Sequence, residues 1–236
     1  MADTHPDCCL DLVASDAFAK MSHLESLQLF QNSLADSTGL VDSLKRSSIR
    51  HLYAGGNHGP KFVRPLAAGL PHIPTLQTLD LRNIAIADEA FSALVAALKE
   101  SSVTRLCLQR CHLSTAALGA LAAALKDSKM VDLAVGFQHW STAHESLEAF
   151  GAALPSTLRH LSLCACGFTL SSAPERNFCK CLSKTSITSL DLHDNEINND
   201  GAQSLASNLP SHLTRLHLGF NQIGSAGARA LANILP

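Results

Sequence analysis

The 236-residue chain has little charge, few aromatic side chains and no long apolar run. Charged residues make up 16% and hydrophobic residues 46% of it, which excludes an intrinsically disordered protein. A formal charge of −2 argues against a nucleic-acid-binding protein, because such proteins carry a basic surface. The longest apolar stretch, Leu113 to Leu125, is too short to cross a bilayer core of about 30 Å. We therefore expect neither a nucleic-acid nor a membrane partner.

Signals for export and for metal binding are also missing. The first residues, MADTHPDCCLDL, lack the basic segment of a signal peptide, and the chain has no Asn-x-Ser/Thr sequon. The eight cysteines include the pairs Cys164/Cys166 and Cys179/Cys181, which are tighter than the C-x-x-C pairs of zinc ribbons. These features predict reduced thiols in an intracellular, cytoplasmic protein, with no metal and no cofactor.

Leucine is abundant and regularly spaced. The pattern L-x-x-L-x-L-x-x-N-x-L fits the chain eight times, at intervals of 25 to 29 residues. Its first positions are Leu24, Ile49, Leu76, Val103, Met130, Leu158, Ile187 and Leu213. Such a period predicts a stack of similar units, each of which needs its neighbours to bury its apolar face. We expect a capping segment at 1–23 and a repeat domain at 24–236.

Each repeat combines the spacing of a strand with the spacing of a helix. The L-x-L portion predicts a short strand with one buried side. Apolar residues at helical spacing follow the strand. They come after Asp88 in the third repeat and Ser114 in the fourth, which are predicted N-caps, and after Asp200 in the seventh. Parallel strands stack at about 4.8 Å, whereas packed helices need about 8–10 Å. We therefore expect a curved stack with the strands inside.

The ninth position of the repeat predicts a buried polar turn. Its side chain is expected to point inward and to bond backbone groups that would otherwise be buried without partners. Asparagine or cysteine occupies this position in six repeats, as Asn32, Asn57, Cys111, Cys166, Asn195 and Asn221. Ile84 and Gln138 depart from the rule, and we expect irregular turns there.

These repeats resemble a known family. The segments ITSLDLHDNEINNDGAQSLASNL and LTRLHLGFNQIGSAGARALANIL are similar to the ribonuclease-inhibitor-like class of leucine-rich repeats. The resemblance implies an α/β fold, a right-handed solenoid or horseshoe of about eight repeats, with parallel strands on the concave face and helices on the convex face. It also implies that the concave face binds other proteins. Members include cytosolic inhibitors, innate-immune receptors, small-GTPase regulators and secreted bacterial effectors.

We therefore predict a protein-binding scaffold that is not an enzyme. Mixed charge with scattered aromatic residues suits a protein partner, since Tyr, Phe and Arg are typical anchors. The predicted concave-face residues are Tyr53, Arg82, Arg105, Phe137, Asp191, His193, Arg215, His217 and Phe220. Two alternatives stay open. One is a regulator of a small GTPase, or the substrate-recognition part of a bacterial effector (in the host cytoplasm) or ubiquitin ligase whose catalytic domain lies elsewhere. The other is a structural solenoid that assembles with itself.

Some neighbouring residues suggest chemistry, but the arrangement does not favour it. Cys164 should lie beside His193 with Asp191 on the same face, a set typical of a thiol nucleophile, yet an open sheet offers no oxyanion donors. Ser162, Asp191 and His217 should align across three repeats, but a catalytic triad needs its base in the middle. We expect an Asp191–His217 hydrogen bond instead. His160, His193, His217 and Cys164 have the spacing of a metal site but no matching motif, so we predict none.

The loops and the end of the chain leave further possibilities. The second repeat contains the run Gly55 to Pro60, and the sixth contains Ser171 to Pro174. Such loop-rich segments are either contact points on the rim or tolerated drift. The sequence stops at Leu235-Pro236 without a polar capping repeat, although solenoids need polar terminal faces. We expect self-association through this end, a further domain, or a last helix polar enough to cap itself.

Overall fold

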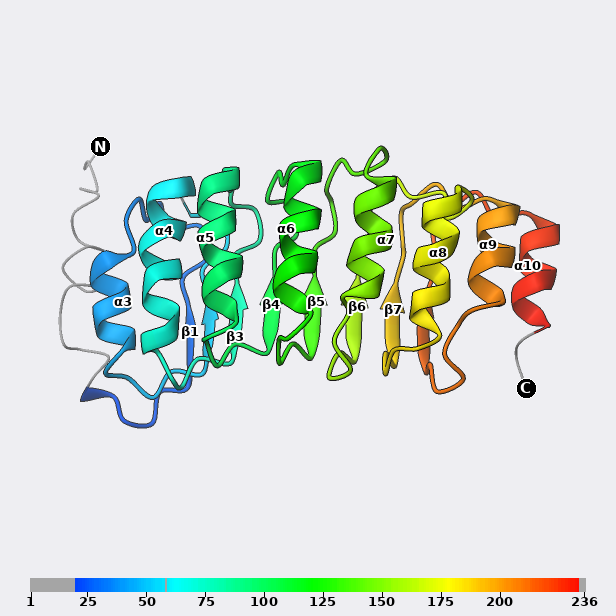
Figure 1. The fold of residues 1–236 in the computed structure, drawn as a ribbon. Helices are drawn as coiled ribbons and strands as arrows, with labels where there is room; N and C mark the ends of the chain where they lie inside the picture. Colours follow the sequence, from blue (N-terminus) through cyan, green and yellow to red (C-terminus); the bar gives the residue numbers. More distant parts are fainter. Residues whose placement is uncertain (1–19, 58, 234–236) are drawn as a thin grey trace, which may run out of the picture. The chain divides into compact units, whose positions relative to one another are not determined.

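The computed structural model describes residues 20–57 and 59–233 (Figure 1). The chain divides into two compact units, Met1–Cys111 and His112–Pro236. Each unit alternates parallel strands with helices. The capping segment predicted at 1–23 lies outside the described residues except for residues 20–23.

The described part of the first unit contains four parallel strands, each followed along the chain by a loop or helix. The strands are β1 (Ser26–Gln28), β2 (His51–Tyr53), β3 (Thr78–Asp80) and β4 (Arg105–Cys107). The helices are α3 (Thr38–Leu44), α4 (Gly59–Gly69), the short 3-10 helix η1 (Leu70–His72) and α5 (Asp88–Leu98). Each strand pairs with the next, with Leu27, Leu52, Leu79 and Leu106 in register.

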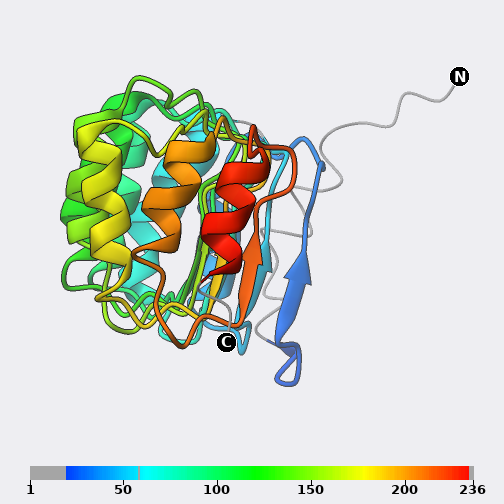
Figure 2. The same cartoon turned by 90° about the vertical axis from the view of Figure 1, so that its right-hand side faces the viewer.

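The second unit repeats this arrangement. Its strands are β5 (Asp132–Ala134), β6 (His160–Ser162), β7 (Ser189–Asp191) and β8 (Arg215–His217). Its helices are α6 (Thr115–Leu125), α7 (His144–Ala152), α8 (Ala173–Leu182), α9 (Asn199–Ala206) and α10 (Ser225–Ala232). Strands β5 to β8 pair in sequence order, and Figure 2 shows α8, α9 and α10 on one side of β8. The predicted α/β repeat is confirmed.

The core of each unit lies between its strands and its helices. In the inner repeats the central leucine of every strand is buried, and so are the apolar residues on one face of the following helix. The largest fully buried side chains are Phe62 and Phe91 in the first unit and Trp140, Phe150, Phe168 and Phe178 in the second. Full burial of such a side chain contributes about 1.5–3 kcal/mol, so the sheet and the helices are held together mainly by this layer.

The ninth-position amide satisfies the backbone of the turn, as predicted. Oδ1 of Asn195 accepts hydrogen bonds from the amides of Cys166 and Phe168, both at 3.1 Å. Its Nδ2 donates to the carbonyls of Leu163 and Leu192, at 2.9 and 3.0 Å. The amide thereby joins the turns of two successive repeats, and Asn57 does the same in the first unit.

Two expectations for this position were wrong. Gln138 does not make its turn irregular, because its longer side chain bonds the backbone as asparagine does. Its Oε1 accepts from the amide of Leu113 at 2.9 Å, and its Nε2 donates to the carbonyl of Gly136 at 3.2 Å. Asn32 is exposed rather than inward. Within residues 20–57 and 59–233, its side chain donates to the nearby carbonyl of Phe30 and to no other group.

The eighth residue of every repeat, just before the ninth-position residue, has a left-handed backbone conformation. The φ angles at this eighth position lie between 51° and 71°. The residues are Gln31, Gly56, Asn83, Arg110, Phe137, Ala165, Asp194 and Phe220. The reversal turns the chain off the strand and projects the eighth side chain beyond the end of the strand. Only glycine and, to a lesser degree, asparagine and aspartate adopt this conformation readily.

Side-chain caps start several helices, though not always at the residues expected. Ser114 caps α6 as predicted, with its hydroxyl accepting from the amide of Ala117. Asp88 is not an N-cap, because the extended residue before the helix is Ala87 and Asp88 already lies in the first turn. A carboxylate there still interacts favourably with the helix dipole. In the seventh repeat Asn198 is the cap, and Asp200 lies inside the helix.

The two loop-rich segments are helix starts. In the second repeat α4 begins at Gly59, shortly after Gly55 and Gly56. In the sixth, Ser172 caps α8 and Glu175 bonds back to the amide of Ser172, forming a complete capping box with Pro174 in the first turn. The small residues and prolines there are explained by this local geometry.

Candidate functional site

The strand face of each unit is formed by the third, fifth, seventh and eighth positions of its repeats. The third, fifth and seventh side chains alternate with the buried leucines and so point away from the helices. The eighth, in its left-handed turn, lies just beyond the end of the strand. Among the described residues, only three large apolar side chains are exposed: Met21, Phe30 and Phe220. Phe30 and Phe220 both lie on a strand face, although burying such groups is favourable. The strand faces are therefore the candidate binding surfaces.

In the first unit four strand-face side chains form a cluster, which we call the Arg82 cluster: Phe30, Tyr53, Asp80 and Arg82. Asp80 is buried, and its carboxylate accepts from Nε of Arg82 at 2.8 and 3.0 Å and from Nη2 at 2.6 Å. Oδ1 of Asp80 also accepts from the backbone amide of Arg82. The guanidinium is thus held by a buried partner while 44% of its side chain remains exposed.

Two aromatic rings complete the Arg82 cluster. Cζ of Arg82 lies 5.9 Å from the centroid of the Phe30 ring, within the range of a cation–π interaction. The rings of Phe30 and Tyr53 are tilted at 42° with centroids 6.1 Å apart. The hydrogen bonds raise the pKa of Arg82 above its ordinary value, so the group keeps its positive charge. A partner would meet a fixed cation flanked by exposed aromatic surface.

Gly55 makes this arrangement possible. A Cβ added to Gly55 would lie 2.8 Å from Cγ of Arg82 and 3.0 Å from Cε1 of Phe30. The arginine stem and the phenylalanine ring therefore meet over the bare backbone of the repeat between them. The sequence predicted Tyr53 and Arg82 as anchors and placed Phe30 on the same face without predicting it as an anchor. The glycine at the seventh position of the repeat between Phe30 and Arg82 is the signal that could have indicated their contact.

In the second unit, Ser162, Asp191, His193 and Phe220 form what we call the Asp191 cluster. Oγ of Ser162 donates to Oδ2 of Asp191 at 2.9 Å, and the amide of His193 donates to Oδ1 at 3.0 Å. The His193 ring packs edge-on against Phe220, with centroids 5.0 Å apart. The carboxylate is thus fixed at the base of a histidine–phenylalanine pair, and 81% of Phe220 is exposed.

The remaining predicted anchors are not part of either cluster. Arg105 is exposed on β4, next to Thr78 of β3. Arg215 and His217 are exposed on β8, and Phe137 is half-buried at an eighth position. The predicted Asp191–His217 hydrogen bond was wrong: within the described residues the Asp191 carboxylate bonds Ser162 and the His193 amide instead.

Four of the described cysteines, Cys111, Cys164, Cys166 and Cys179, are buried, and Cys107 and Cys181 are half-buried. Cys164 is buried, and a methyl group at Gly136 would collide with its sulfur, whereas His193 lies over Gly219 on the other side. The side chains of Cys164 and His193, the pair considered as a thiol nucleophile and its base, therefore lie against different repeats. Burial raises the pKa of the Cys107 thiol to about 11 and those of Cys111 and Cys166 to about 12, so these thiols are protonated at neutral pH and unreactive.

Neither a metal site nor a membrane span is found in the part of the chain that the structure describes. No group of three or more His, Cys, Asp or Glu side chains there is arranged to hold a metal ion. No helix between residues 20 and 233, residue 58 apart, is long and apolar enough to span a bilayer.

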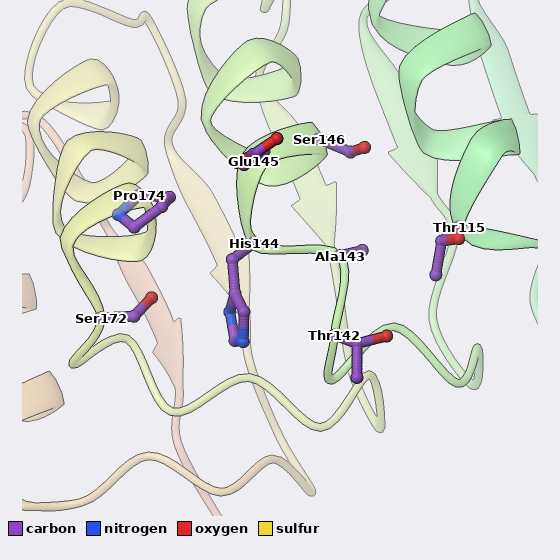
Figure 3. Close-up of a pocket in the computed structure, with 8 residues that line it drawn as sticks. All are labelled: Thr115, Thr142, Ala143, His144, Glu145, Ser146, Ser172 and Pro174. Carbon is purple, nitrogen blue, oxygen red and sulfur yellow. The ribbon is translucent and has the colours of Figure 1, made fainter.

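A separate open pocket of about 420 Å³ lies where helices α6, α7 and α8 begin (Figure 3). Hydroxyls of Thr115, Thr142, Ser146 and Ser172 line it, and His144 projects into it from the start of α7. Nδ1 of His144 is buried without a hydrogen-bond partner in the described structure, 3.7 Å from the carboxylate of Glu175. The pocket is a polar surface hollow of the helix ends rather than part of the strand face.

We expect Glu175 to make the stability of the second unit depend on pH. Burial alone would raise the pKa of this carboxyl, but hydrogen bonds from Ser172 and Thr169 outweigh it and hold the pKa below its ordinary value of 4.5. A lowered pKa in the folded state stabilises the fold above the unfolded pKa, and this contribution is lost as pH falls through the folded value. Glu175→Gln should cost about 1 kcal/mol at pH 7.

The difference between the wild type and Glu175→Gln should shrink below pH 4.5, as followed by urea denaturation at a series of pH values. Glu145→Gln, at an exposed carboxylate in the first turn of α7, is the control and should change little. A constant difference between wild type and Glu175→Gln across the acid range would contradict the role assigned to the charge.

Comparisons with known proteins agree with this geometry. A family model described as Leucine Rich repeat matches residues 183–206 and 210–232, which hold the last two repeats. No curated protein matches the chain in sequence.

A solved structure shares its fold. The chain is similar to the leucine-rich-repeat-containing protein LegL7 from Legionella pneumophila, with 18% identity, a TM-score of 0.60, and coverage of 91% of this chain and 81% of that one. The tropomodulin C-terminal domain of Caenorhabditis elegans is 14% identical, with a TM-score of 0.48 over 64% of this chain and 92% of that one. At 18% identity the likeness to LegL7 is one of fold.

Proposed function

Since the chain has the leucine-rich-repeat fold, we propose that it is a non-enzymatic scaffold that binds a protein through its strand faces. The observation that carries this proposal is the placement of its exposed large apolar side chains. Among the described residues, two of the three, Phe30 and Phe220, lie on a strand face, and each is held by an aromatic or charged neighbour.

The chemistry of these clusters suits protein recognition. Binding energy in protein interfaces is concentrated in a few Tyr, Trp and Arg side chains that are fixed before binding and surrounded by weaker contacts. The Arg82 cluster offers such a set, because Asp80 fixes the arginine and Phe30 and Tyr53 support it. Regulation of a small GTPase, or substrate recognition within an effector or a ubiquitin ligase, would be particular uses of the same surface.

The test compares proteins retained from cell lysate by the wild type and by a strand-face variant, Phe30→Ala with Tyr53→Ala. These substitutions leave the Asp80–Arg82 pair intact. We expect a partner held by the wild type to bind the variant at least about thirtyfold more weakly, the effect of losing an interface hot spot of about 2 kcal/mol. The affinity is then measured by calorimetry with the purified partner.

The matched control is Arg64→Ala with Glu89→Ala, which removes an exposed ion pair between α4 and α5 on the helix side. It should bind as the wild type does. Equal binding by the strand-face variant and the wild type would refute the proposal for the first unit. Recovery of untagged copies of the chain itself would favour the self-assembling solenoid instead.

A further inference from the structure

The two strand faces carry opposite charges. At the third, fifth, seventh and eighth positions of its repeats, the first unit has three arginines and one aspartate. At the same positions the second unit has three aspartates and one arginine. Neither face has a lysine or glutamate at these positions. The charged residues are Arg82, Arg105, Arg110 and Asp80 in the first unit, and Asp132, Asp191, Asp194 and Arg215 in the second.

Opposite charges are paired at two places in the first unit. Asp80 is buried and forms an ion pair with Arg82, so the charges of these two residues balance. Nearby Glu25, at a second position, lies 3.6 Å from Arg50 and is likewise balanced. Arg105 and Arg110 are exposed on the same face. The surface that a partner meets is therefore cationic, with the aromatic surface of Phe30 and Tyr53 beside it.

From this charge pattern we propose that the strand face of the first unit binds an acidic segment of a protein partner. The segment would place carboxylates against Arg105, Arg110 and the open side of the Arg82 guanidinium. Arginine pairs with carboxylates through planar, directed hydrogen bonds, which favours this chemistry over other anions. An apolar side chain next to the carboxylates would contact Phe30, which is 39% exposed. This inference rests on the proposed function and adds the chemistry of the partner.

A peptide rather than a nucleic acid is the occupant that the face favours. Nucleic-acid surfaces depend on many phosphate contacts, whereas this face offers three arginines. The second strand face, with its three aspartates, would itself repel a polyanion, whereas a protein can carry both signs of charge and match either face.

The inference is tested with labelled peptides that contain phenylalanine and are rich in Asp and Glu, in Asn and Gln, or in Lys. We expect the acidic peptide to bind most tightly to the wild type, and its binding to weaken as salt rises. Arg105→Glu with Arg110→Glu should weaken it about tenfold or more, because both substitutions reverse the charge. Arg64→Glu, on α4 in the helix layer, is the matched control and should leave binding unchanged.

Each outcome bears on the proposal. Equal binding of the neutral or the Lys-rich peptide would overturn the acidic segment, and so would failure of all three peptides to bind. Tighter binding of single-stranded DNA than of the acidic peptide, with the same loss in the double variant, would overturn it in favour of a nucleic acid. The proposed function would survive these results if a captured protein partner still lost affinity for Phe30→Ala with Tyr53→Ala.

Discussion

Replacing Asn195 by alanine should lower the free energy of unfolding by about 3–5 kcal/mol, because several buried backbone groups lose their partner at once. The substitution strips hydrogen bonds from the amides of Cys166 and Phe168 and from the carbonyls of Leu163 and Leu192. A buried polar group left without a partner costs about 1–3 kcal/mol. This decrease in the free energy of unfolding should be several times larger than that caused by an ordinary surface substitution.

The first repeat supplies a control of the same residue type. Asn32 is exposed and, among the described residues, its side chain bonds the carbonyl of Phe30 alone, so Asn32→Ala should cost less than about 0.5 kcal/mol. Urea denaturation followed by circular dichroism gives the two midpoints. Midpoints are the proper measure, because repeat proteins do not always unfold in a single step. Similar midpoints for Asn195→Ala and Asn32→Ala would show that the inter-repeat amide does not hold the turns.

Two glycine-to-alanine substitutions should have opposite effects on stability. Gly201 lies in the first turn of α9, and a Cβ there would overlap the backbone carbonyl oxygen of Thr169 in the preceding repeat. Because a backbone atom cannot move aside as a side chain can, Gly201→Ala should cost about 3 kcal/mol. Gly119, inside α6, has no atom within 4 Å of the added group.

Gly119→Ala should therefore stabilise the protein by about 0.5–1 kcal/mol, since glycine loses more conformational freedom than alanine in a helix. Differential scanning calorimetry would show a lower melting temperature for Gly201→Ala and a higher one for Gly119→Ala. If both substitutions raised the melting temperature, the close approach of α9 to the Thr169 backbone would be wrong.

The repeat itself could be predicted from the sequence because each of its parts is set by local residues. The leucine spacing located the strands, and the ninth-position asparagines located the turns. The exceptions have physical reasons. Gln138 acts as asparagine does because its extra methylene still lets the amide reach the same groups, and Asp88 fails as a cap because the chain is already helical at that residue.

The strand-face clusters were harder to predict, because they depend on contacts between repeats. Arg82 is held by Asp80 of its own strand, which the short spacing indicates, but its contact with Phe30 needs the glycine of the intervening repeat. Burial of Cys164 likewise depends on Gly136 one repeat earlier. A single repeat does not carry this information, whereas a comparison of equivalent positions along the stack does.

At the left-handed eighth position, backbone stability and the proposed binding role favour different residues. A non-glycine residue held in that conformation costs about 1 kcal/mol, and a β-carbon is what makes it costly. Phe137 and Phe220 accept this cost with large rings at φ angles of 60° and 55°, where glycine would suit the backbone better. Replacing either phenylalanine by glycine would remove the backbone strain of the turn, but it would also remove the aromatic ring. Selection for stability would therefore favour glycine at these two positions, whereas selection for the proposed binding would favour phenylalanine.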